Sequence, residues 1–182
     1  MNKDEKYQNL ERVNSWINNV DTKISYMLAF IGIIATIIFT NDNVIKTIKV
    51  YIDNVLNFTL KDIANLLSFL LLILTGAMVL CISRSIYHLL KASTATIKSN
   101  NKSQEDSLLF FGSISKNQSF EEFKEKVENS DEDKIEDDIL MQIYNNSVIC
   151  NKKFENYNKA ILDIKKALII LLIIAITVFF NI

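Results

Sequence analysis

The chain has 182 residues and a formal net charge of −1, and 49% of its residues are hydrophobic whereas 23% are charged. A nearly neutral chain presents no basic field, so DNA and RNA are not expected partners. With no Pro, three Gly and two Cys outside any CxxC spacing, the sequence disfavours a turn-rich β fold, a disulfide framework and a zinc site, and no metal or cofactor is expected. Apolar and charged residues lie in separate stretches, which predicts an all-α membrane protein with a distinct polar part.

The N-terminal segment 1–23 is predicted to be a polar cytoplasmic helix that leads without a break into a first transmembrane helix over 24–40. The apolar run holds 17 uncharged residues. That is roughly 25 Å of helix against a hydrocarbon core of about 30 Å, and Lys23 can snorkel at its edge. Because a long polar segment precedes the run, we interpret it as a retained span and not as a signal peptide. One apolar stripe joins the two parts and contains Leu10, Val13, Ile17, Val20 and Ile24.

Residues 41–62 are predicted to form an outer loop with an amphipathic helix on the membrane surface. The apolar positions of this helix recur at helical spacing and are Val44, Ile45, Ile48, Ile52, Val55, Leu56 and Leu60. A second transmembrane helix is predicted over 63–83, where 21 uncharged residues follow one another. They would form roughly 31 Å of helix, which is enough to cross a bilayer.

The polar region 84–166 is predicted to be a cytoplasmic, ligand-sensing bundle of helices. The helix of the second span is expected to continue to about Ser99, and Gly112 in "LLFFGSI" is expected at a turn. Ser119 and Glu122 have the spacing of a capping box, which predicts the start of a short helix. The acidic run "NSDEDKIEDD" is interpreted as the solvated start of the last helix in preference to a metal site.

The last helix is predicted to run on into a third transmembrane helix over 167–182. This apolar run has 16 residues, roughly 24 Å of helix, and Lys165 and Lys166 can snorkel beside it. Steps of four and three residues predict a coiled-coil-like seam of Ile143, Ser147, Cys150, Phe154, Tyr157, Ile161, Ile164 and Leu168. The expected fold is therefore three transmembrane helices with long cytoplasmic extensions packed as a helical bundle.

Lysine and arginine are unevenly distributed around the predicted spans. They precede the first span, follow the second and precede the third, whereas the 41–62 loop has only three lysines. The positive-inside bias therefore places the N-terminus and residues 84–166 in the cytoplasm and makes the chain a multi-pass protein.

Three basic side chains after the second span share one helix face. Arg84, His88 and Lys91 are spaced four and three residues apart. Basic residues at this depth commonly hold the phosphates of the inner leaflet. A sharper interpretation is a ligand phosphate gripped by the planar guanidinium of Arg84, and the two roles are compatible.

The stretch "WINNVDTKISYMLAF" carries Asp21 and Lys23 to the edge of the first apolar run. A carboxylate at the edge of hydrocarbon needs a cationic partner, because its desolvation is costly. Arg84 is the predicted partner, since it follows the second span at a similar depth. The charged pair is interpreted as a boundary feature of the membrane, with recognition of a charged ligand as the alternative.

The stretch "QIYNNSVICNKKF" before the last span is rich in amides and contains an aromatic ring. Amides read base edges and aromatic rings stack on bases, so a nucleotide contact is one interpretation of this stretch. The candidate residues are Gln142, Tyr144, Asn146, Ser147, Asn151 and Lys153. Asn is abundant along the whole chain, however, so composition alone also explains much of the pattern.

Catalytic patterns are missing from the sequence. It has no H-E-x-x-H, G-x-S-x-G or Walker A motif, and its one histidine, His88, follows a membrane span closely. We therefore expect a protein that is not an enzyme.

Three stretches, "NSWINNVDTKISYMLAF", "FFGSI" and "QIYNNSVICNKKFENYNKAI", together resemble the transmembrane effector family of the Pycsar bacterial antiphage defence systems. The resemblance covers most of the chain in order and spacing. It departs from the family at Phe154, where Tyr is commoner, and at Ile24, where a small residue is commoner. The matching residues are Trp16, Ile17, Asp21, Thr22 and Lys23 before the first span, Phe110, Phe111 and Gly112 in mid-chain, and Gln142, Ser147, Lys153 and Phe154 before the last span.

The resemblance implies an effector that is activated by a cyclic nucleotide, which a partner cyclase makes after phage infection. Such an effector impairs the bacterial inner membrane and causes abortive infection. The messenger stays open between a cyclic pyrimidine mononucleotide and another cyclic nucleotide. The implied partners are the lipid bilayer, the messenger and further copies of the chain in a homo-oligomer, where small residues such as Gly32 and Gly76 let spans approach closely.

Two sets of site residues follow from these patterns and from the resemblance. The expected ligand-binding residues are Arg84, His88, Lys91, Phe110, Phe111, Tyr144, Ser147 and Lys153. The expected structural or gating residues are Trp16, Asp21, Lys23, Gly112, Gln142 and Phe154. The alternative function is a non-enzymatic membrane scaffold whose cytoplasmic bundle binds a protein partner without binding a nucleotide.

Overall fold

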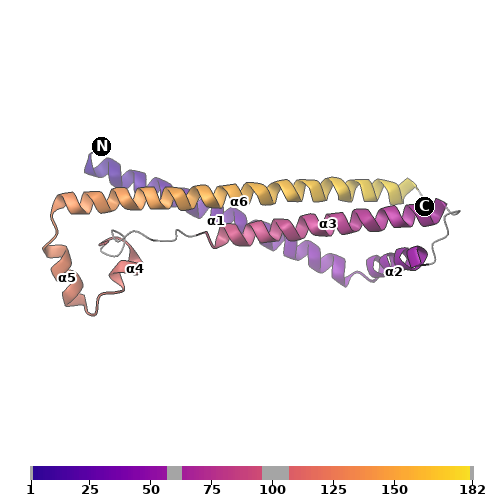
Figure 1. Ribbon diagram of the computed structural model, residues 1–182, viewed down its shortest axis with the longest axis horizontal. Coiled ribbons are helices and arrows are strands. Elements are labelled where there is room, and N and C mark those ends of the chain that lie inside the picture. The colour runs from indigo at the N-terminus through magenta and orange to yellow at the C-terminus, as the bar shows by residue number, and fades with distance from the viewer. Residues whose placement is uncertain (1, 57–62, 96–106, 181–182) are drawn as a thin grey trace. The chain divides into compact units, whose positions relative to one another are not determined.

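The structure, a computed structural model, describes residues 2–56, 63–95 and 107–180. Within these ranges the chain is helical and contains no strand, so the all-α prediction is confirmed. The helices follow one another along the chain (Figure 1) as α1 (Lys3–Thr40), α2 (Asp42–Leu56), α3 (Ile63–Ser93), α4 (Phe111–Ile114), α5 (Phe120–Glu128) and α6 (Glu132–Phe180).

The chain divides into two compact units. Unit 1 comprises Met1–Thr22 and Thr94–Phe154, and unit 2 comprises Lys23–Ser93 and Glu155–Ile182. The two long helices, α1 and α6, each contribute residues to both units. Unit 1 therefore contains the polar half of α1, and unit 2 contains its apolar half.

Side-chain caps fix the starts of α5 and α6. Ser119 caps α5 by accepting a hydrogen bond from the backbone N–H of Glu122 at 3.2 Å, as the capping-box spacing predicts. The Glu122 carboxylate reaches one residue further back than in an ideal box and accepts from the backbone N–H of Gln118 at 2.8 Å. The acidic run begins α6, and Asp131 accepts from the backbone N–H of Lys134 at 2.9 Å. The interpretation of this run as a helix start is confirmed.

Two local expectations are wrong. Helix α3 ends at Ser93 and not near Ser99, a position that lies outside the described residues. Gly112 lies inside the one-turn helix α4 and not at a turn with positive φ. A Cβ at this glycine would lie 2.6 Å from the Cε1 atom of the Phe110 ring, so the space taken by that ring explains the glycine.

In unit 1, α1 and α6 run parallel. Lys3 pairs with Glu132 at 3.5 Å and Lys6 pairs with Glu136. Farther along, the side chains of Asn14 and Asn146 share a hydrogen bond at 2.8 Å, and those of Asp21 and Lys153 share one at 2.7 Å. Residue numbers rise together on both helices, which is the signature of a parallel pair. The predicted α1 stripe faces inward: Leu10, Val13 and Ile17 are half-buried, and Val20 and Ile24 are buried.

The seam of α6 differs from the predicted one. Most predicted positions are displaced by one residue, although Cys150 is buried as expected. The predicted seam consisted mainly of the larger apolar side chains. In the structure the buried positions are mostly polar residues, several of which pair with other segments, and small residues that let helices approach closely. The buried residues of α6 are Asp138, Ile139, Gln142, Asn145, Cys150 and Lys153 in unit 1, and Asn156, Ala160, Asp163 and Ala167 in unit 2.

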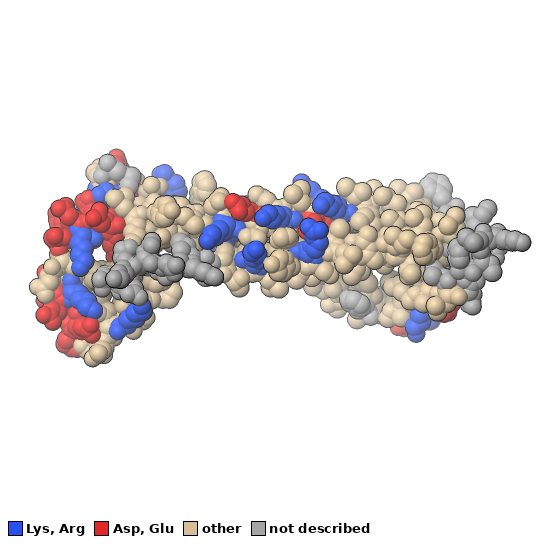
Figure 2. Space-filling view, viewed as in Figure 1, with Lys and Arg blue, Asp and Glu red and all other residues tan. Residues whose placement is uncertain are grey.

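Among the described residues, two helices are long and apolar enough to cross a membrane, one within α1 (Lys3–Ile38) and one within α3 (Leu66–Ser93). Unit 2 holds the apolar part of both. Only 6% and 11% of their most apolar stretches are buried, whereas the core helix of a soluble protein would be mostly buried. Large apolar side chains such as Ile33 and Leu80 therefore face outward. On the face in Figure 2, several Lys and Arg side chains gather with a few acidic ones over the middle of the view, and further charged side chains lie at the left end and over α2. The stretch of α3 and α6 to the right of the middle group shows no charge.

The predicted third span does not meet the same test within the described residues. The 18 residues of α6 that end at Phe180 include three charged ones, Asp163, Lys165 and Lys166. The uncharged part that the structure describes, Ala167–Phe180, would be roughly 21 Å long, shorter than a hydrocarbon core of about 30 Å. Two of the three predicted transmembrane helices are therefore supported.

Candidate functional site

An ion pair joins α1 and α6 where both helices reach the boundary of unit 1. Lys153 Nζ donates to Asp21 Oδ1 at 2.7 Å, and the side chains are 7% and 43% exposed. Lys153 has lost most of its contact with water, so the nearby carboxylate matters more than it would on the surface. The predicted partner of Asp21 was Arg84; the structure pairs Asp21 with Lys153 and brings Arg84 to Asp163 at 3.5 Å.

A cysteine thiol lies one helical turn before Lys153. Cys150 is buried. Burial raises the pKa of the Cys150 thiol above its ordinary value, the positive charge of Lys153 opposes this rise, and the negative charge of Asp21 adds to it. The thiol is therefore protonated at neutral pH and is a poor nucleophile, which fits a packing role.

A buried network holds the segment before α4 against α6. The Asp138 carboxylate accepts from Ser107 Oγ at 2.7 Å and from the backbone N–H groups of Leu108 and Leu109 at 2.8 and 3.1 Å. Ser107 Oγ in turn accepts from the backbone N–H of Phe110 at 2.9 Å and from Gln142 Nε2 at 3.2 Å. A carboxylate with several N–H and O–H donors is well stabilised even when it is buried.

This network positions the two aromatic rings of the "FFG" motif. The rings of Phe110 and Phe111 lie 4.8 Å apart between centroids and are tilted by 53°. Phe110 is half-buried over Gly112, whereas Phe111 is 77% exposed. The structure thus separates the motif into one ring that packs internally and one ring that is presented to the surroundings.

The remaining predicted residues of unit 1 lie on the two long helices. Tyr144 is 68% exposed, and Trp16 is also exposed. Ser147 is exposed and donates a hydrogen bond from its hydroxyl to the backbone carbonyl of Ile143 at 2.7 Å. Phe154 is half-buried at the end of the unit. Of these side chains, the rings of Tyr144 and Trp16 are the best placed to touch a ligand.

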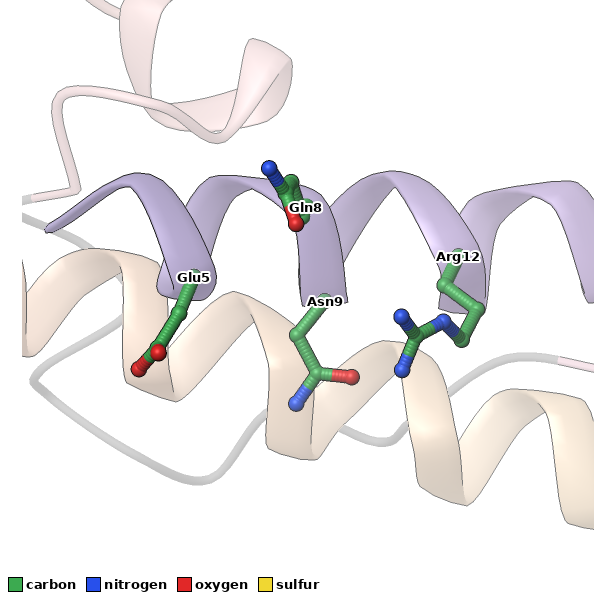
Figure 3. Close-up of a pocket in the computed structure, with 4 residues that line it drawn as sticks. All are labelled: Glu5, Gln8, Asn9 and Arg12. Carbon is green, nitrogen blue, oxygen red and sulfur yellow. The ribbon is translucent and has the colours of Figure 1, made fainter. Parts of the chain in front are cut away.

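A shallow depression of about 230 Å³ lies on unit 1 beside the polar half of α1. Figure 3 shows its four lining side chains, Glu5, Gln8, Asn9 and Arg12, all of which come from α1. The depression offers a guanidinium, two amides and a carboxylate, which suit a small polar ligand. Because a single helix lines it, it does not bring groups from different segments together.

The predicted basic face of α3 belongs to unit 2. Arg84 Nε and Lys166 Nζ lie 3.5 and 3.6 Å from the buried carboxylate of Asp163. Lys91 lies 6.0 Å from the ring centroid of Tyr87, at the outer limit of a cation–π contact. The role predicted for this face, holding inner-leaflet phosphates or a ligand phosphate, stays a prediction.

The ring of His88 meets the neighbouring Tyr87 ring edge-on at 5.4 Å. Its Nδ1 atom is buried and has no hydrogen-bond partner among the described residues. The residue as a whole is half-buried, so a ligand contact by His88 stays a prediction. Lys23, also in unit 2, is exposed at the start of the apolar half of α1.

The structure thus brings together only part of the predicted site. Phe110 and Gln142 both donate to Ser107 Oγ, and Gly112 lies against the Phe110 ring. Asp21 meets Lys153. Arg84, His88 and Lys91 lie in the other unit, in contacts of their own.

Sequence reasoning missed three residues. They are Ser107 and Asp138, which anchor the motif, and Arg12, which lines the depression on α1. Asp138 lies in an acidic run that is typical of a solvated helix start. The available signal was its position four residues before Gln142, on the same helical face. For Arg12 the signal was that the chain has only one other arginine.

These features define a class of protein: a helical membrane protein in which a polar unit, held by buried charged and hydrogen-bonded groups, continues into exposed apolar helices. Residues 6–181 match the family described as the Pycsar effector protein domain. The chain is also 36% identical over 167 residues to the Pycsar effector protein GmPycTM of Gulbenkiania mobilis, an alignment that covers 87% of this chain and 84% of that protein. This chain belongs to the Pycsar effector family. No solved structure matches it.

Proposed function

We propose that this chain is a cyclic-nucleotide-activated effector of antiphage defence that impairs the bacterial inner membrane and causes abortive infection. The observation that carries the proposal is the continuity of α1 and α6, which pass from the polar packing of unit 1 into apolar stretches without a break. In the proposed mechanism, these helices connect a part that binds a messenger to a part that acts on lipid. A partner cyclase would supply the messenger.

Unit 1 is made of two segments that are far apart in the chain, and this supports two membrane crossings between them. Met1–Thr22 and Thr94–Phe154 pack in one compact unit, so both lie on the same side of a bilayer. The chain between them must then cross the bilayer an even number of times, and the apolar stretches of α1 and α3 supply two crossings. The positive-inside bias assigns unit 1 to the cytoplasm, where a cyclase product would be found. A third crossing by residues 167–182 stays a prediction.

We assign messenger binding to the surface of unit 1. The exposed rings of Phe111 and Tyr144 offer stacking surfaces for a base, and the guanidinium of Arg12 offers a bidentate contact for a phosphate. We do not include Lys153 among the proposed ligand-binding residues, because it is buried and already paired with Asp21. This assignment does not choose between a cyclic pyrimidine mononucleotide and another cyclic nucleotide.

Activation would be a shift in population between two packings of α1 against α6. A messenger that binds one packing more tightly favours that packing, and the continuous helices carry the change into the apolar unit. The Asp21–Lys153 pair lies at the boundary, where such a change must pass. At Gly32 and Gly76, nothing lies within 4 Å of the position that a Cβ would occupy, so both glycines are open to close contacts between copies of the chain.

A leakage assay on proteoliposomes tests the proposal. Vesicles that contain the full chain and a trapped dye are mixed with each of several cyclic mononucleotides and cyclic oligonucleotides. We expect one of them to release dye, and we expect Phe111→Ala and Tyr144→Ala to need at least about tenfold more of it, because a stacked base is worth about 1–3 kcal/mol. Phe120→Ala is the matched control, since Phe120 is an exposed ring of unit 1 on α5 and should respond normally.

The possible results of this assay test the proposed function and the assigned binding site separately. Leakage that no cyclic nucleotide changes would overturn the proposed function. A normal response by both ring variants would leave the function standing and overturn the assignment of the site.

A further inference from the structure

Helix α2 has an apolar face and a charged face that the proposed function does not use. The charged residues follow one another in steps of four and three, so they lie together on one side of the helix. They are Asp42, Lys46, Lys49 and Asp53. The apolar face lies on a different side and contains Val44, Ile45, Ile48, Tyr51 and Ile52. The helix is therefore amphipathic along its whole length.

The connections of α2 hold it beside the two apolar helices of unit 2. Asn41 is the one residue between the end of α1 and the start of α2. Its backbone carbonyl accepts hydrogen bonds from the N–H groups of Val44 and Ile45 at 3.1 and 3.3 Å, so the chain turns directly into the new helix. Helix α2 also packs against α3. Both neighbours contain stretches that can cross a membrane, so α2 lies where such a stretch ends.

Packing on α3 leaves much of the apolar face uncovered. Ile45, Ile48 and Ile52 are 38%, 37% and 41% exposed. A row of aliphatic side chains at the end of two membrane-crossing helices is unfavourable in water and favourable in contact with acyl chains. The charged face has two lysines and two aspartates and is therefore neutral, so attraction to anionic lipids does not drive the contact.

We propose that α2 is an interfacial lipid-binding helix. It lies in the plane of the leaflet opposite to the N-terminal segment of the chain, with Ile45, Ile48 and Ile52 among the acyl chains and the charged face among the headgroups. The occupant of the apolar face is lipid, and no partner protein is required. The inference rests on the membrane insertion in the proposed function and is independent of the messenger.

Fluorescence quenching by lipid tests the inference on the full chain in vesicles. Trp16 is the one tryptophan, so the Trp16→Phe protein has no tryptophan fluorescence. A single new tryptophan can therefore be introduced into it and followed alone. Ile48→Trp reports on the apolar face. Val50→Trp is the matched control, because Val50 is aliphatic, 54% exposed and on the opposite side of α2. Leu70→Trp on α3 reports whether the chain is inserted at all.

With phosphatidylcholine brominated on its acyl chains, we expect quenching of the Ile48→Trp protein to be at least about threefold stronger than quenching of the Val50→Trp protein. Replacing part of the lipid by an anionic one should not change this ratio. Ile45 and Ile52 lie on the same face, so the Ile45→Trp and Ile52→Trp proteins should behave like the Ile48→Trp protein. The test therefore does not depend on the folding of a single variant.

The other outcomes overturn the inference. Equal quenching of the Ile48→Trp and Val50→Trp proteins would mean that α2 is surrounded by hydrocarbon and does not lie at the interface. Quenching of neither, with Leu70→Trp quenched, would mean that protein and not lipid covers the apolar face. Absence of quenching from Leu70→Trp would instead overturn the membrane insertion on which the inference rests.

Discussion

The ammonium of Lys153 lies 2.7 Å from the carboxylate of Asp21, and both residues stand at the end of unit 1 on parallel helices. The two partners differ in burial, since the Lys153 side chain is 7% exposed and the Asp21 side chain 43%. The pair is therefore not a symmetric surface salt bridge. A charge that has been removed from water depends more on its partner than a charge that is still hydrated.

Asp21→Ala should accordingly destabilise the protein more than Lys153→Met. The first change takes a carboxylate away from a buried ammonium, and we expect a loss of about 2 kcal/mol, reduced from the value for a fully buried pair because Asp21 is partly hydrated. The second replaces the buried ammonium by an apolar group of similar length and should cost less than about 1 kcal/mol. Thermal unfolding of the detergent-solubilised protein measures both. Equal losses would show that the burial of Lys153 does not matter.

Asp138→Ala should loosen the segment that carries the "FFG" motif. The change removes the acceptor of the Leu108 and Leu109 backbone N–H groups, and an unsatisfied buried donor costs about 1–3 kcal/mol. Hydrogen exchange of these two amides should become at least about tenfold faster. Asp137→Ala is the matched control because Asp137 is the exposed neighbour on the same helix. Unchanged exchange in the Asp138 variant would contradict the anchoring role of this carboxylate.

Gly112→Ala should destabilise unit 1 by about 1–3 kcal/mol, because the added methyl group would overlap the Phe110 ring. Gly76→Ala should not destabilise a single chain, because nothing lies within 4 Å of the position that its Cβ would occupy and Ala is favoured over Gly in a helix interior by about 1 kcal/mol. The steric cause is checked with a double variant. In a Phe110→Leu background, Gly112→Ala should lose most of its effect on thermal unfolding, whereas a cost that persists there would point to backbone conformation.

The contact between Lys6 and Glu136 predicts a weakening of unit 1 in acid. A hydrogen bond from Lys6, helped by the positive charges of Lys6 and Lys3, holds the pKa of Glu136 below its ordinary value of 4.5. A pKa that is lower in the folded state gives stability that is present above pH 4.5 and is lost as the pH falls through the folded value. Unfolding followed from pH 7 downward should show this loss, and Lys6→Met should reduce it. A Lys6→Met protein with an unchanged acid profile would exclude this pair as a source.

The long helices could be predicted from sequence because they depend on local patterns. Few breakers and uncharged runs define α1 and α3, and the spacing of Ser119 and Glu122 defines the start of α5. The stripe from Leu10 to Ile24 also faces inward as predicted, because large apolar residues recur there at one helical face.

The polar partners could not be predicted, because they come from segments far apart in the chain. Asp21 meets Lys153 across 132 positions, and Ser107 meets Asp138 across 31. Hydrophobic periodicity says nothing about which charged groups will be buried. The α6 seam was therefore predicted one residue away from most of the positions where polar and small residues make the contacts.

The sequence by itself determined the class of this protein, since segregated apolar and charged runs make long helices with a membrane part and a polar part, and three short motifs indicated its family. Only the tertiary structure decided that α1 and α6 run parallel, that Lys153 is a packing partner of Asp21, and that Asp138 anchors the "FFG" motif. The physical reason is range: helix formation depends on neighbours three and four positions apart, whereas the pairing of buried charges depends on which helices meet.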